Sequence, residues 1–259
     1  MEKLNSEHSV REQYGNAEKL NIRIALHQRY STNQQPFAEW IYRQYELKEN
    51  QRILEVGCGD GSMWQTADRM LPSGTTLLLT DFSAGMLETA RKNVKGEKVS
   101  FLQADIQALP FPDDAFDIVI GNMMLYHVPD LHKGLMEVRR VLKKGGLFYA
   151  ATYGENGITS YLQELLEDYG VSRDMNKTFT LQNGQETLLK HFDHVELHMR
   201  EDALAITEVE DLLDYIFSLT SMMGAENVER DELRQILLSR QKDGVIHIPK
   251  EYGIFVAEK

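Results

Sequence analysis

The sequence predicts an α/β domain built on a doubly wound parallel sheet. Between residues 52 and 152, short apolar runs alternate with segments of helical pattern. The runs are continuously apolar rather than alternating, which is typical of strands buried on both faces of a parallel sheet. The first run ends in closely spaced glycines. A length of 259 residues allows one such domain together with a smaller cap.

The central segment predicts five strands and the helices between them. The strands are expected at Arg52–Gly57, Thr75–Asp81, Val99–Ala104, Phe116–Gly121 and Leu147–Thr152. The helices are expected at Ser62–Met70, Ala84–Lys95 and Leu131–Leu142, the last of them stopped by the Lys-Lys-Gly-Gly segment at 143–146. This order predicts parallel strands joined by crossover helices.

The two flanks have a different pattern. Residues 1–48 look helical, with a second helix at Pro36–Tyr45. After Thr152 the regular alternation breaks, and the late helices are expected to form a lid over the carboxyl edge of the sheet. The predicted helices are Ser160–Tyr169, Leu181–His191, Val209–Ser218 and Asp231–Arg240, and the predicted strands are His194–Arg200, Val245–Ile248 and Gly253–Ala257.

Composition narrows the classes of partner. Forty acidic residues against 28 basic ones give a formal charge of −12, which argues against a broad nucleic-acid interface. No apolar run approaches the roughly 18 residues that span a bilayer, and the N-terminus is polar, so we expect a cytoplasmic protein. The single cysteine, Cys58, excludes internal disulfides and a cysteine-rich zinc site. We expect a small-molecule substrate, no metal ion, and a monomer or homodimer.

The strongest local motif is Ile-Leu-Glu-Val-Gly-Cys-Gly-Asp-Gly at 53–61. A sharp turn from strand to helix needs one glycine, whereas three in alternation permit close approach of a ligand to the backbone. The dinucleotide fingerprint G-x-G-x-x-G places its third glycine one residue later than Gly61. In addition, Glu55 would repel a pyrophosphate and would tolerate a cationic amino group. The motif therefore disfavours a nicotinamide dinucleotide.

Acidic residues also follow the next two strands. Asp81 ends the second strand, where a carboxylate can accept hydrogen bonds from both ribose hydroxyls. Asp105 follows the third strand and could accept a bond from the amino group of adenine. A lone aspartate at a strand end more often caps a helix or forms a turn, and for Asp105 alone we prefer that interpretation. Three acids at the ends of three consecutive strands, Glu55, Asp81 and Asp105, make a coincidence less favoured than a shared ligand.

Four segments together resemble the class I S-adenosylmethionine (SAM) dependent methyltransferases that act on small molecules. They are ILEVGCGDG, LLLTDFSAGML, FLQADIQALPFPDDAFDIVIGNMMLYHV and VRRVLKKGGLFYAAT, and they cover roughly residues 50–152 in the expected order. The resemblance implies a Rossmann-like sheet of seven strands with the last strand reversed, plus helical lid insertions. Residues 245–257 would form the terminal hairpin of that sheet.

The resemblance also implies a set of cofactor-binding residues, with S-adenosylhomocysteine as the product. Glu55 to Gly61, including Gly57, Cys58 and Gly59, would contact the methionine portion of SAM. Asp81 would hold the ribose. The others are Phe82 and Met86 beside the adenosine, Asp105 and the Ile106 backbone at the adenine, and Asn122 with Met123 beneath the sulfonium, the Asn122 carbonyl lying near the amino group. The segment 121–124 lacks the Asn-Pro-Pro-aromatic motif of the amino-methylating DNA enzymes.

His127 is the candidate catalytic residue. It follows the fourth strand, at the rim where an acceptor would approach, and an ordinary imidazole pKa near 6.5 suits a proton acceptor. It can equally be an orienting group or a histidine packed against the sheet, and the sequence leaves these alternatives open. Trp64, after the glycine motif, is expected to be a core residue.

These expectations combine into a domain plan and a function. The plan is an N-terminal helical lid segment (1–48), a SAM-binding core (49–152), a substrate-side lid with one core strand (153–244, with the strand at about 194–200) and terminal strands of the core sheet (245–259). The expected function is methyl transfer from SAM to oxygen or nitrogen of a small molecule. The alternatives are a SAM-binding protein without turnover and, less favoured, a nicotinamide-dependent oxidoreductase.

Overall fold

The chain folds into two compact units. A computed structural model describes residues 17–170, 176–223 and 228–259. One unit, which we call the sheet unit, is drawn from residues 35–153, 176–200 and 252–259. The other, the helical unit, is drawn from residues 1–34, 154–175 and 201–251. Each unit is described by itself below.

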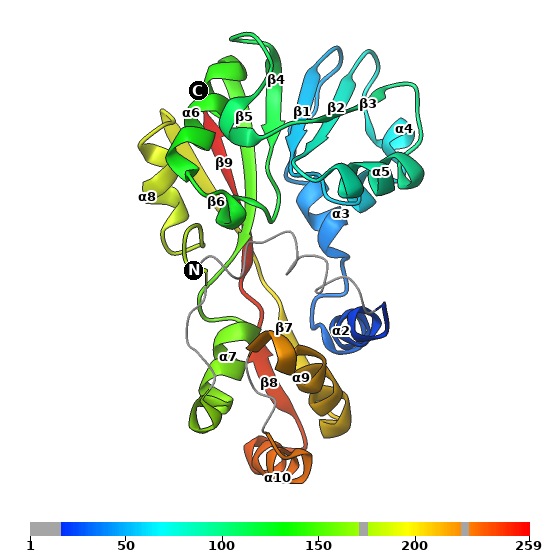
Figure 1. Ribbon diagram of the computed structural model, residues 1–259, viewed down its shortest axis with the longest axis vertical. Coiled ribbons are helices and arrows are strands. Elements are labelled where there is room, and N and C mark those ends of the chain that lie inside the picture. Colours follow the sequence, from blue (N-terminus) through cyan, green and yellow to red (C-terminus); the bar gives the residue numbers. More distant parts are fainter. Residues whose placement is uncertain (1–16, 171–175, 224–227) are drawn as a thin grey trace. The chain divides into compact units, whose positions relative to one another are not determined.

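The sheet unit contains a seven-stranded sheet in the order β3-β2-β1-β4-β5-β9-β6 (Figure 1). Neighbouring strands from β3 through β5 pair in parallel, and β9 pairs antiparallel with both β5 and β6. The predicted fold class is confirmed, including the reversed last strand. The bounds are β1 Arg52–Val56, β2 Thr76–Asp81, β3 Val99–Gln103, β4 Phe116–Ile120, β5 Leu142–Tyr153, β6 His194–Arg200 and β9 Tyr252–Glu258.

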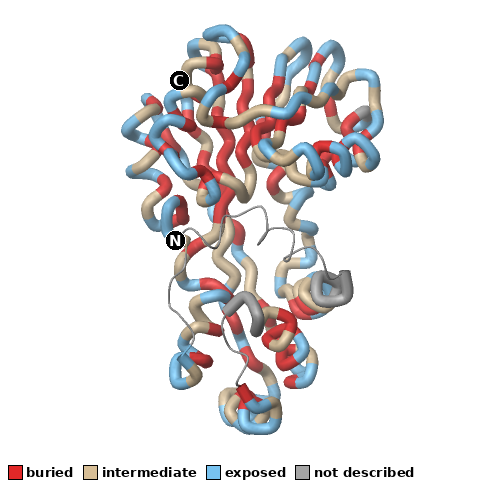
Figure 2. The backbone as a smooth tube through the Cα atoms, in the orientation of Figure 1, coloured by how far each residue is buried: buried red, intermediate tan, exposed pale blue. Residues whose placement is uncertain are grey.

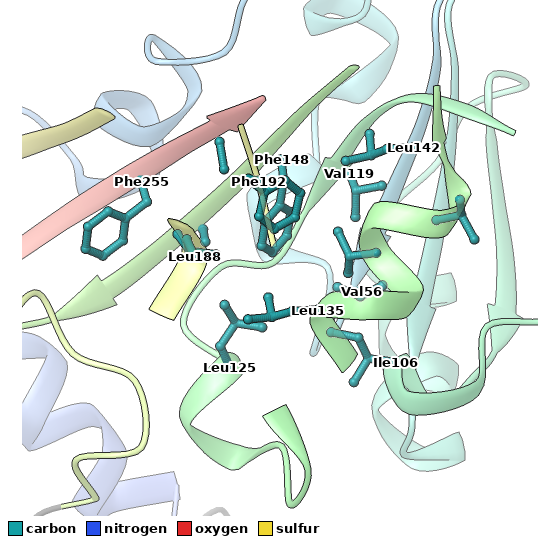
Figure 3. Packing of buried hydrophobic residues seen from close by; sticks show 14 of the residues in the cluster. Val56, Ile106, Val119, Leu125, Leu135, Leu142, Phe148, Leu188, Phe192 and Phe255 are labelled. Carbon is teal, nitrogen blue, oxygen red and sulfur yellow. The ribbon is translucent and has the colours of Figure 1, made fainter. Parts of the chain in front are cut away.

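Burial explains why the central strands read as continuous apolar runs. In β1 every residue from Ile53 to Val56 is buried, and in β4 all but Asp117 are buried. Figure 2 shows buried backbone running along the strands of the sheet. On one face, Leu135 of α6 lies with Val56 and Val119 in a single apolar cluster, part of which is drawn in Figure 3. This packing holds the carboxyl ends of β1 and β4 in place.

Two helices of the sheet unit begin at side-chain caps that the sequence supplies. Ser83 accepts a hydrogen bond from the Met86 N–H, and Asp130 accepts one from the Lys133 N–H. The predicted helix Ser62–Met70 is instead two short pieces, because Thr66 has a non-helical backbone. The helices are α3 Phe37–Tyr42, α4 Ala67–Met70, α5 Ala84–Asn93, α6 Leu131–Val141 and α8 Gly184–Leu189, with 3₁₀ turns η1 Ser62–Trp64, η2 Ile106–Ala108 and η3 Leu125–His127.

The helical unit has a hydrophobic core of its own. α2 packs against α9, and residues such as Leu26, Leu213 and Leu237 are buried in one cluster. β7 and β8 form a separate two-stranded antiparallel sheet. The elements are α2 Ala17–Tyr30, α7 Ile158–Leu165, η4 Glu167–Tyr169, β7 Ala203–Ile206, α9 Val209–Met223, α10 Arg230–Arg240 and β8 Ile246–Pro249.

The expected terminal hairpin of the core sheet is wrong in one strand. β8 pairs with β7, whereas β9 alone of the two late strands joins the seven-stranded sheet. Ile246 and Ile248 are buried in the core of the helical unit while His247 and Pro249 are exposed, so β8 has one buried face only. Two residues then separate β8 from β9.

The predicted lid segments also divide differently from the plan. The described parts of 1–34, 154–175 and 201–251 share one unit, whereas α8 and β6 within the planned lid belong to the sheet unit. Residues 1–16 lie outside the described residues. That the helical unit covers a cofactor stays a prediction. None of the helices in the described ranges is long and apolar enough to cross a membrane.

Candidate active site

The glycine motif forms a left-handed turn between β1 and η1. Gly57, Gly59 and Gly61 have φ values of +66°, +57° and +69°. A Cβ atom on Gly57 would lie 2.9 Å from Cγ of Met124, so the backbone there is in close contact with a side chain. A Cβ atom on Gly59 would meet no atom within 4 Å. The turn therefore leaves open space at its middle glycine, where a ligand can approach the backbone.

Asp81 lies directly against this turn. One carboxylate oxygen accepts a hydrogen bond from the Gly59 N–H (2.9 Å), and the other accepts one from the Ser83 N–H (2.8 Å). Burial raises the pKa of Asp81, and the two N–H groups partly offset that effect. Each oxygen retains a further lone pair that can accept a hydrogen bond from a hydroxyl group. Of the two neighbours predicted at the adenosine, Phe82 is 73% exposed and Met86 is half-buried.

Asp105 caps the 3₁₀ turn η2 at the end of β3. Its carboxylate accepts a hydrogen bond from the Gln107 N–H at 2.8 Å, which is the capping role that the sequence favoured. The Ala104 N–H donates to the Asp81 carbonyl oxygen (3.1 Å), so the ends of β2 and β3 lie together. The side chain of Ile106 is buried in the apolar core, which leaves its backbone as the part that could contact a ligand.

Glu55 is a buried carboxylate with few donors. Its residue is 3% exposed, and one oxygen accepts a hydrogen bond from the indole N–H of Trp64 at 2.5 Å. Burial raises the pKa of Glu55 to about 7; Trp64 and Asn122 lower it in part, and the charge of Asp81 raises it. A carboxyl group that is partly protonated near neutral pH is typical of functional sites.

Asn122 adds a second unusual acceptor. Its side-chain nitrogen donates a hydrogen bond to the hydroxyl oxygen of Tyr45 at 2.6 Å. Its side-chain oxygen is buried and has no hydrogen-bond donor among the described residues. Buried polar atoms are nearly always paired, so this oxygen is suited to a donor on a ligand. Met123 follows with a positive φ of +53°.

Cys58 and His127 are less strongly connected to the other predicted site residues. Burial raises the pKa of the Cys58 thiol, and the charge of Glu55 adds to that effect, so this cysteine is not an activated nucleophile. His127 lies on η3, with its ring centroid 4.5 Å from that of Tyr126. Partial burial lowers the pKa of His127 although its side chain reaches solvent. Among the described contacts, no hydrogen bond joins its imidazole to Asn122, Glu55 or the glycine turn.

Two residues of this site were not identified from the sequence. Trp64 is fully buried, as expected of a core residue, and its indole N–H donates a hydrogen bond to Glu55. Tyr45 precedes β1 and lies outside the four family segments, so no motif marks it. A general rule could have suggested both, because buried tryptophan and tyrosine normally find a partner for their polar atom.

The sequence profile of a family described as a methyltransferase domain matches residues 54–150. That range runs from β1 into β5 and contains the glycine turn, Asp81, Asp105 and Asn122, in the sheet with one reversed strand. The chain contains a class I methyltransferase domain. Domains of this class use SAM.

Known proteins similar to the chain match mainly in this methyltransferase domain. A ubiquinone/menaquinone biosynthesis C-methyltransferase of Pectobacterium carotovorum is 36% identical over 104 residues, which is 39% of this chain and 41% of the relative. A sterol 24-C-methyltransferase of Gibberella zeae is 31% identical over 143 residues, 54% of this chain and 34% of the relative. The chain thus spans at most about two fifths of the length of these relatives.

A solved structure extends the similarity in fold to the whole chain. The phosphoethanolamine N-methyltransferase 2 of Haemonchus contortus, in complex with SAM, has a TM-score of 0.57 and 20% sequence identity. The similarity covers 100% of this chain and 59% of that one. At this identity the comparison shows a shared fold.

The donor and acceptor chemistry of the methyltransferase domain fits SAM. The backbone at Gly59 has open space beside it and is bonded to Asp81, which has lone pairs for ribose hydroxyls. Glu55 and Asn122 add two further acceptors at the ends of the neighbouring strands. The hydroxyls and the ammonium group of SAM are donors. A dinucleotide would instead place a pyrophosphate near two carboxylates. Within the described ranges, no three His, Cys, Asp or Glu side chains are grouped closely enough to hold a metal ion.

Proposed function

We propose that this chain is an enzyme that transfers a methyl group from SAM to a small molecule. The observation that supports it most strongly is the set of acceptors around the glycine turn. Glu55, Asp81 and the side-chain oxygen of Asn122 provide acceptors for the amino end and the ribose of SAM. All three belong to the carboxyl ends of neighbouring parallel strands, where ligands of such sheets bind.

The residues of the site would act by orienting both partners. SAM supplies an electrophilic methyl group on a sulfonium, so alignment of an acceptor behind that methyl group carries much of the rate. Asp81 would hold the ribose, and Asp105 with the Ile106 backbone would hold the adenine. Glu55 and Asn122 would fix the amino end. An acceptor that must lose a proton early needs a base, whereas an amine can attack as its free base.

The class of acceptor atom is open to a wider choice than oxygen and nitrogen. Both relatives named above are C-methyltransferases by name. We therefore include carbon acceptors of the activated, phenol-like type beside hydroxyls and amines. The acceptor would be selected by residues outside the family segments.

Equilibrium binding followed by a transfer assay tests this function. Calorimetry with SAM, S-adenosylhomocysteine and NAD should show binding of the first two only. Transfer of a labelled methyl group should then occur to at least one member of a panel of phenols, reduced quinones, sterols, amines and sugars. Binding of NAD alone would overturn the proposal in favour of an oxidoreductase. Binding of SAM with no transfer to any panel member would favour the SAM-binding alternative.

His127 is proposed as the base or orienting group for the acceptor. If it removes a proton, His127→Ala should lower turnover by roughly 10²–10⁴-fold with little change in SAM affinity. Turnover of the wild-type protein should then fall at low pH, with a midpoint below the ordinary value of about 6.5, because partial burial lowers the pKa of His127. His127→Asn should retain much of the activity if the residue only orients the acceptor. Turnover within about threefold of wild type for both variants would remove His127 from the mechanism.

A further inference from the structure

Tyr45 is buried beside Trp64 although it lies outside the methyltransferase segments. It is 8% exposed, and its ring stacks on that of Trp64 with centroids 6.1 Å apart and planes inclined by 13°. Its edge also meets Tyr149 at 5.0 Å. The next residue is fixed as well, since the Glu46 N–H donates to the hydroxyl of Tyr149 at 2.9 Å. These contacts allow the Tyr45 hydroxyl little freedom.

That hydroxyl holds the side chain of Asn122. The 2.6 Å bond runs from the Asn122 nitrogen to the Tyr45 oxygen. Asn122 also lowers the pKa of Glu55 in part. Sδ of Met63 lies 3.6 Å from the same Asn122 nitrogen. Because a thioether sulfur only accepts hydrogen bonds, this contact places the NH₂ end of Asn122 toward Met63 and Tyr45. The orientation of this amide thus follows from its neighbours rather than from its shape alone.

The consequence is an acceptor with no protein donor. With the NH₂ end fixed, the side-chain oxygen of Asn122 is turned to the opposite end of the amide, where it is buried and unpaired among the described residues. Burial first, and the charge of Glu55 second, raise the pKa of Tyr45, so its hydroxyl keeps its proton throughout the ordinary pH range. Glu55 itself is held by Trp64. The neutral acceptor, the side-chain oxygen of Asn122, and the anionic acceptor, Glu55, are therefore both held in place.

We propose that Tyr45 is a positioning residue that aims the side-chain oxygen of Asn122 at the amino group of the methionine portion of SAM. An ammonium group is the ligand chemistry that suits such a pair, since it donates three hydrogen bonds and carries a positive charge. This inference rests on the proposed function. It adds a residue from the segment before β1 to the site and gives the Asn122 side chain a role of its own.

Ligands with and without the amino group test the proposal. S-adenosylhomocysteine and decarboxylated SAM both carry the amino group, whereas 5′-methylthioadenosine lacks the entire amino acid portion. Tyr45→Phe keeps the aromatic stack and removes the hydroxyl. It should weaken binding of the first two ligands by about 3–10-fold, the range for one hydrogen bond, and change binding of 5′-methylthioadenosine by less than about twofold.

Tyr42→Phe is the matched control. The hydroxyl of Tyr42 donates to the Met70 carbonyl oxygen, and its ring meets both Tyr45 and Trp64 edge-on. Its loss removes a hydroxyl from the same aromatic group without touching Asn122, so the ratio of affinities among the three ligands should not change. Thermal denaturation of both variants establishes that each is folded.

A pH titration of the wild-type protein tests the other acceptor of the pair, Glu55. Glu55 faces Trp64, Tyr45, Asn122, Asp81 and Cys58, and of these only Asp81 adds a charge at neutral pH. Protonation of Glu55 below about pH 7 removes the anionic acceptor. In wild type, affinity for S-adenosylhomocysteine should fall by several-fold from pH 8 to pH 6, while that for 5′-methylthioadenosine stays constant.

The outcomes separate this proposal from the proposed function. Equal weakening of all three ligands in Tyr45→Phe would make Tyr45 a structural residue and overturn the inference. Unchanged affinities would overturn it too. If the wild-type protein binds none of the three ligands, the proposed function itself fails.

Discussion

Among the described residues, a carboxylate closed to solvent in the helical unit and another in the sheet unit behave in opposite ways. In the helical unit the side chain of Asp202 is 0% exposed, and in the sheet unit Glu55 is 3% exposed. The pKa of Asp202 is nevertheless lowered to about 2, whereas that of Glu55 is raised to about 7. Both side chains are closed to solvent, and the donors around each carboxylate contribute to the difference.

Asp202 is fully satisfied by its own unit. Burial by itself would raise its pKa, but bonds from Lys250 and Ser31 outweigh that effect. The ammonium of Lys250 lies 2.7 Å from one carboxylate oxygen, and the Ser31 hydroxyl lies 2.7 Å from the other. The N–H groups of Asn33 and Ala203 donate as well. These bonds connect three segments of the helical unit, which follow α2, precede β7 and follow β8.

Glu55 has only neutral donors. Trp64 and Asn122 supply them, and no cation partners the carboxylate among the described contacts. A buried carboxylate whose oxygens are all hydrogen-bonded stabilises the fold. One with unfilled hydrogen-bonding positions can still bind a ligand. The comparison therefore assigns Asp202 to folding and Glu55 to binding, and substitutions can test that assignment.

The largest expected effect follows Asp202→Ala. It leaves the ammonium of Lys250, itself 8% exposed, buried without its counter-charge. Removal of one partner of a buried ion pair costs about 3–5 kcal/mol of unfolding free energy. Urea denaturation at pH 7 measures the loss, and limited proteolysis should show cleavage within the helical unit. The ionised Asp202 contributes stability that is fully present above its unfolded pKa of about 3.9 and is lost as the pH falls from there through about 2, so it is fully present at pH 7.

A surface carboxylate of the same unit provides the control. Asp214 pairs with Arg230, but its side chain is 51% exposed. Asp214→Ala should cost less than about 1 kcal/mol, as exposed ion pairs do. If Asp202→Ala costs no more than Asp214→Ala, the cluster does not fasten the helical unit and the contrast with Glu55 fails.

Glu55→Gln should act in the opposite direction. The folded pKa of Glu55 lies above the unfolded value of about 4.3, so its contribution to stability is present below that value and is lost as the pH rises through about 7. Glutamine cannot ionise and keeps an acceptor for Trp64. At pH 8 the variant should be more stable than wild type by up to about 4 kcal/mol, and the difference should shrink toward pH 5.

Urea denaturation at both pH values measures this difference. The same variant should bind S-adenosylhomocysteine less tightly at pH 8, because the anionic acceptor is gone. Greater stability with weaker binding is the expected pattern of a residue kept for function. A variant that is less stable than wild type at pH 8 would show that ionised Glu55 supports the fold, contrary to the comparison.

The two units also differ in how far the sequence predicts them. Strands β1 to β5 lie between helices along the chain, and each is recognisable as an apolar run, so their order and direction follow from local pattern and the resemblance. The glycine turn, Asp81 and Asn122 follow from the same motifs. β7, in contrast, pairs with a strand about 40 residues later, and neither is long enough to be distinctive. Burial against the core of the helical unit, rather than the local sequence, decides where β8 belongs.

For both carboxylates, the hydrogen-bond partners were the feature that the sequence predicted least well. Asp202 meets Ser31 across 171 positions of sequence, and Asn122 meets Tyr45 across 77. Such pairs depend on the packed arrangement of several elements, and the sequence has no periodicity that reports them. The motif could therefore locate Glu55 but could not indicate which donors it has.

The smallest expected effect concerns the bond from Trp64 to Glu55. The Trp64 N–H stabilises the ionised carboxylate and lowers its pKa in part. Trp64→Phe removes that donor, and a loss of about 1 kcal/mol for the ionised form raises the pKa by about 0.7 unit. The carboxyl ¹³C resonance of Glu55, followed by NMR against pH, measures the midpoint directly. Asp202 in the same spectra should keep its low midpoint, because its donors are untouched. Loss of packing around the smaller ring would lower the stability of the fold but would not by itself raise the Glu55 midpoint. Water that entered the site would lower that midpoint. A midpoint that stays or falls would show that burial alone sets the charge of Glu55, and that the donors do not distinguish the two carboxylates.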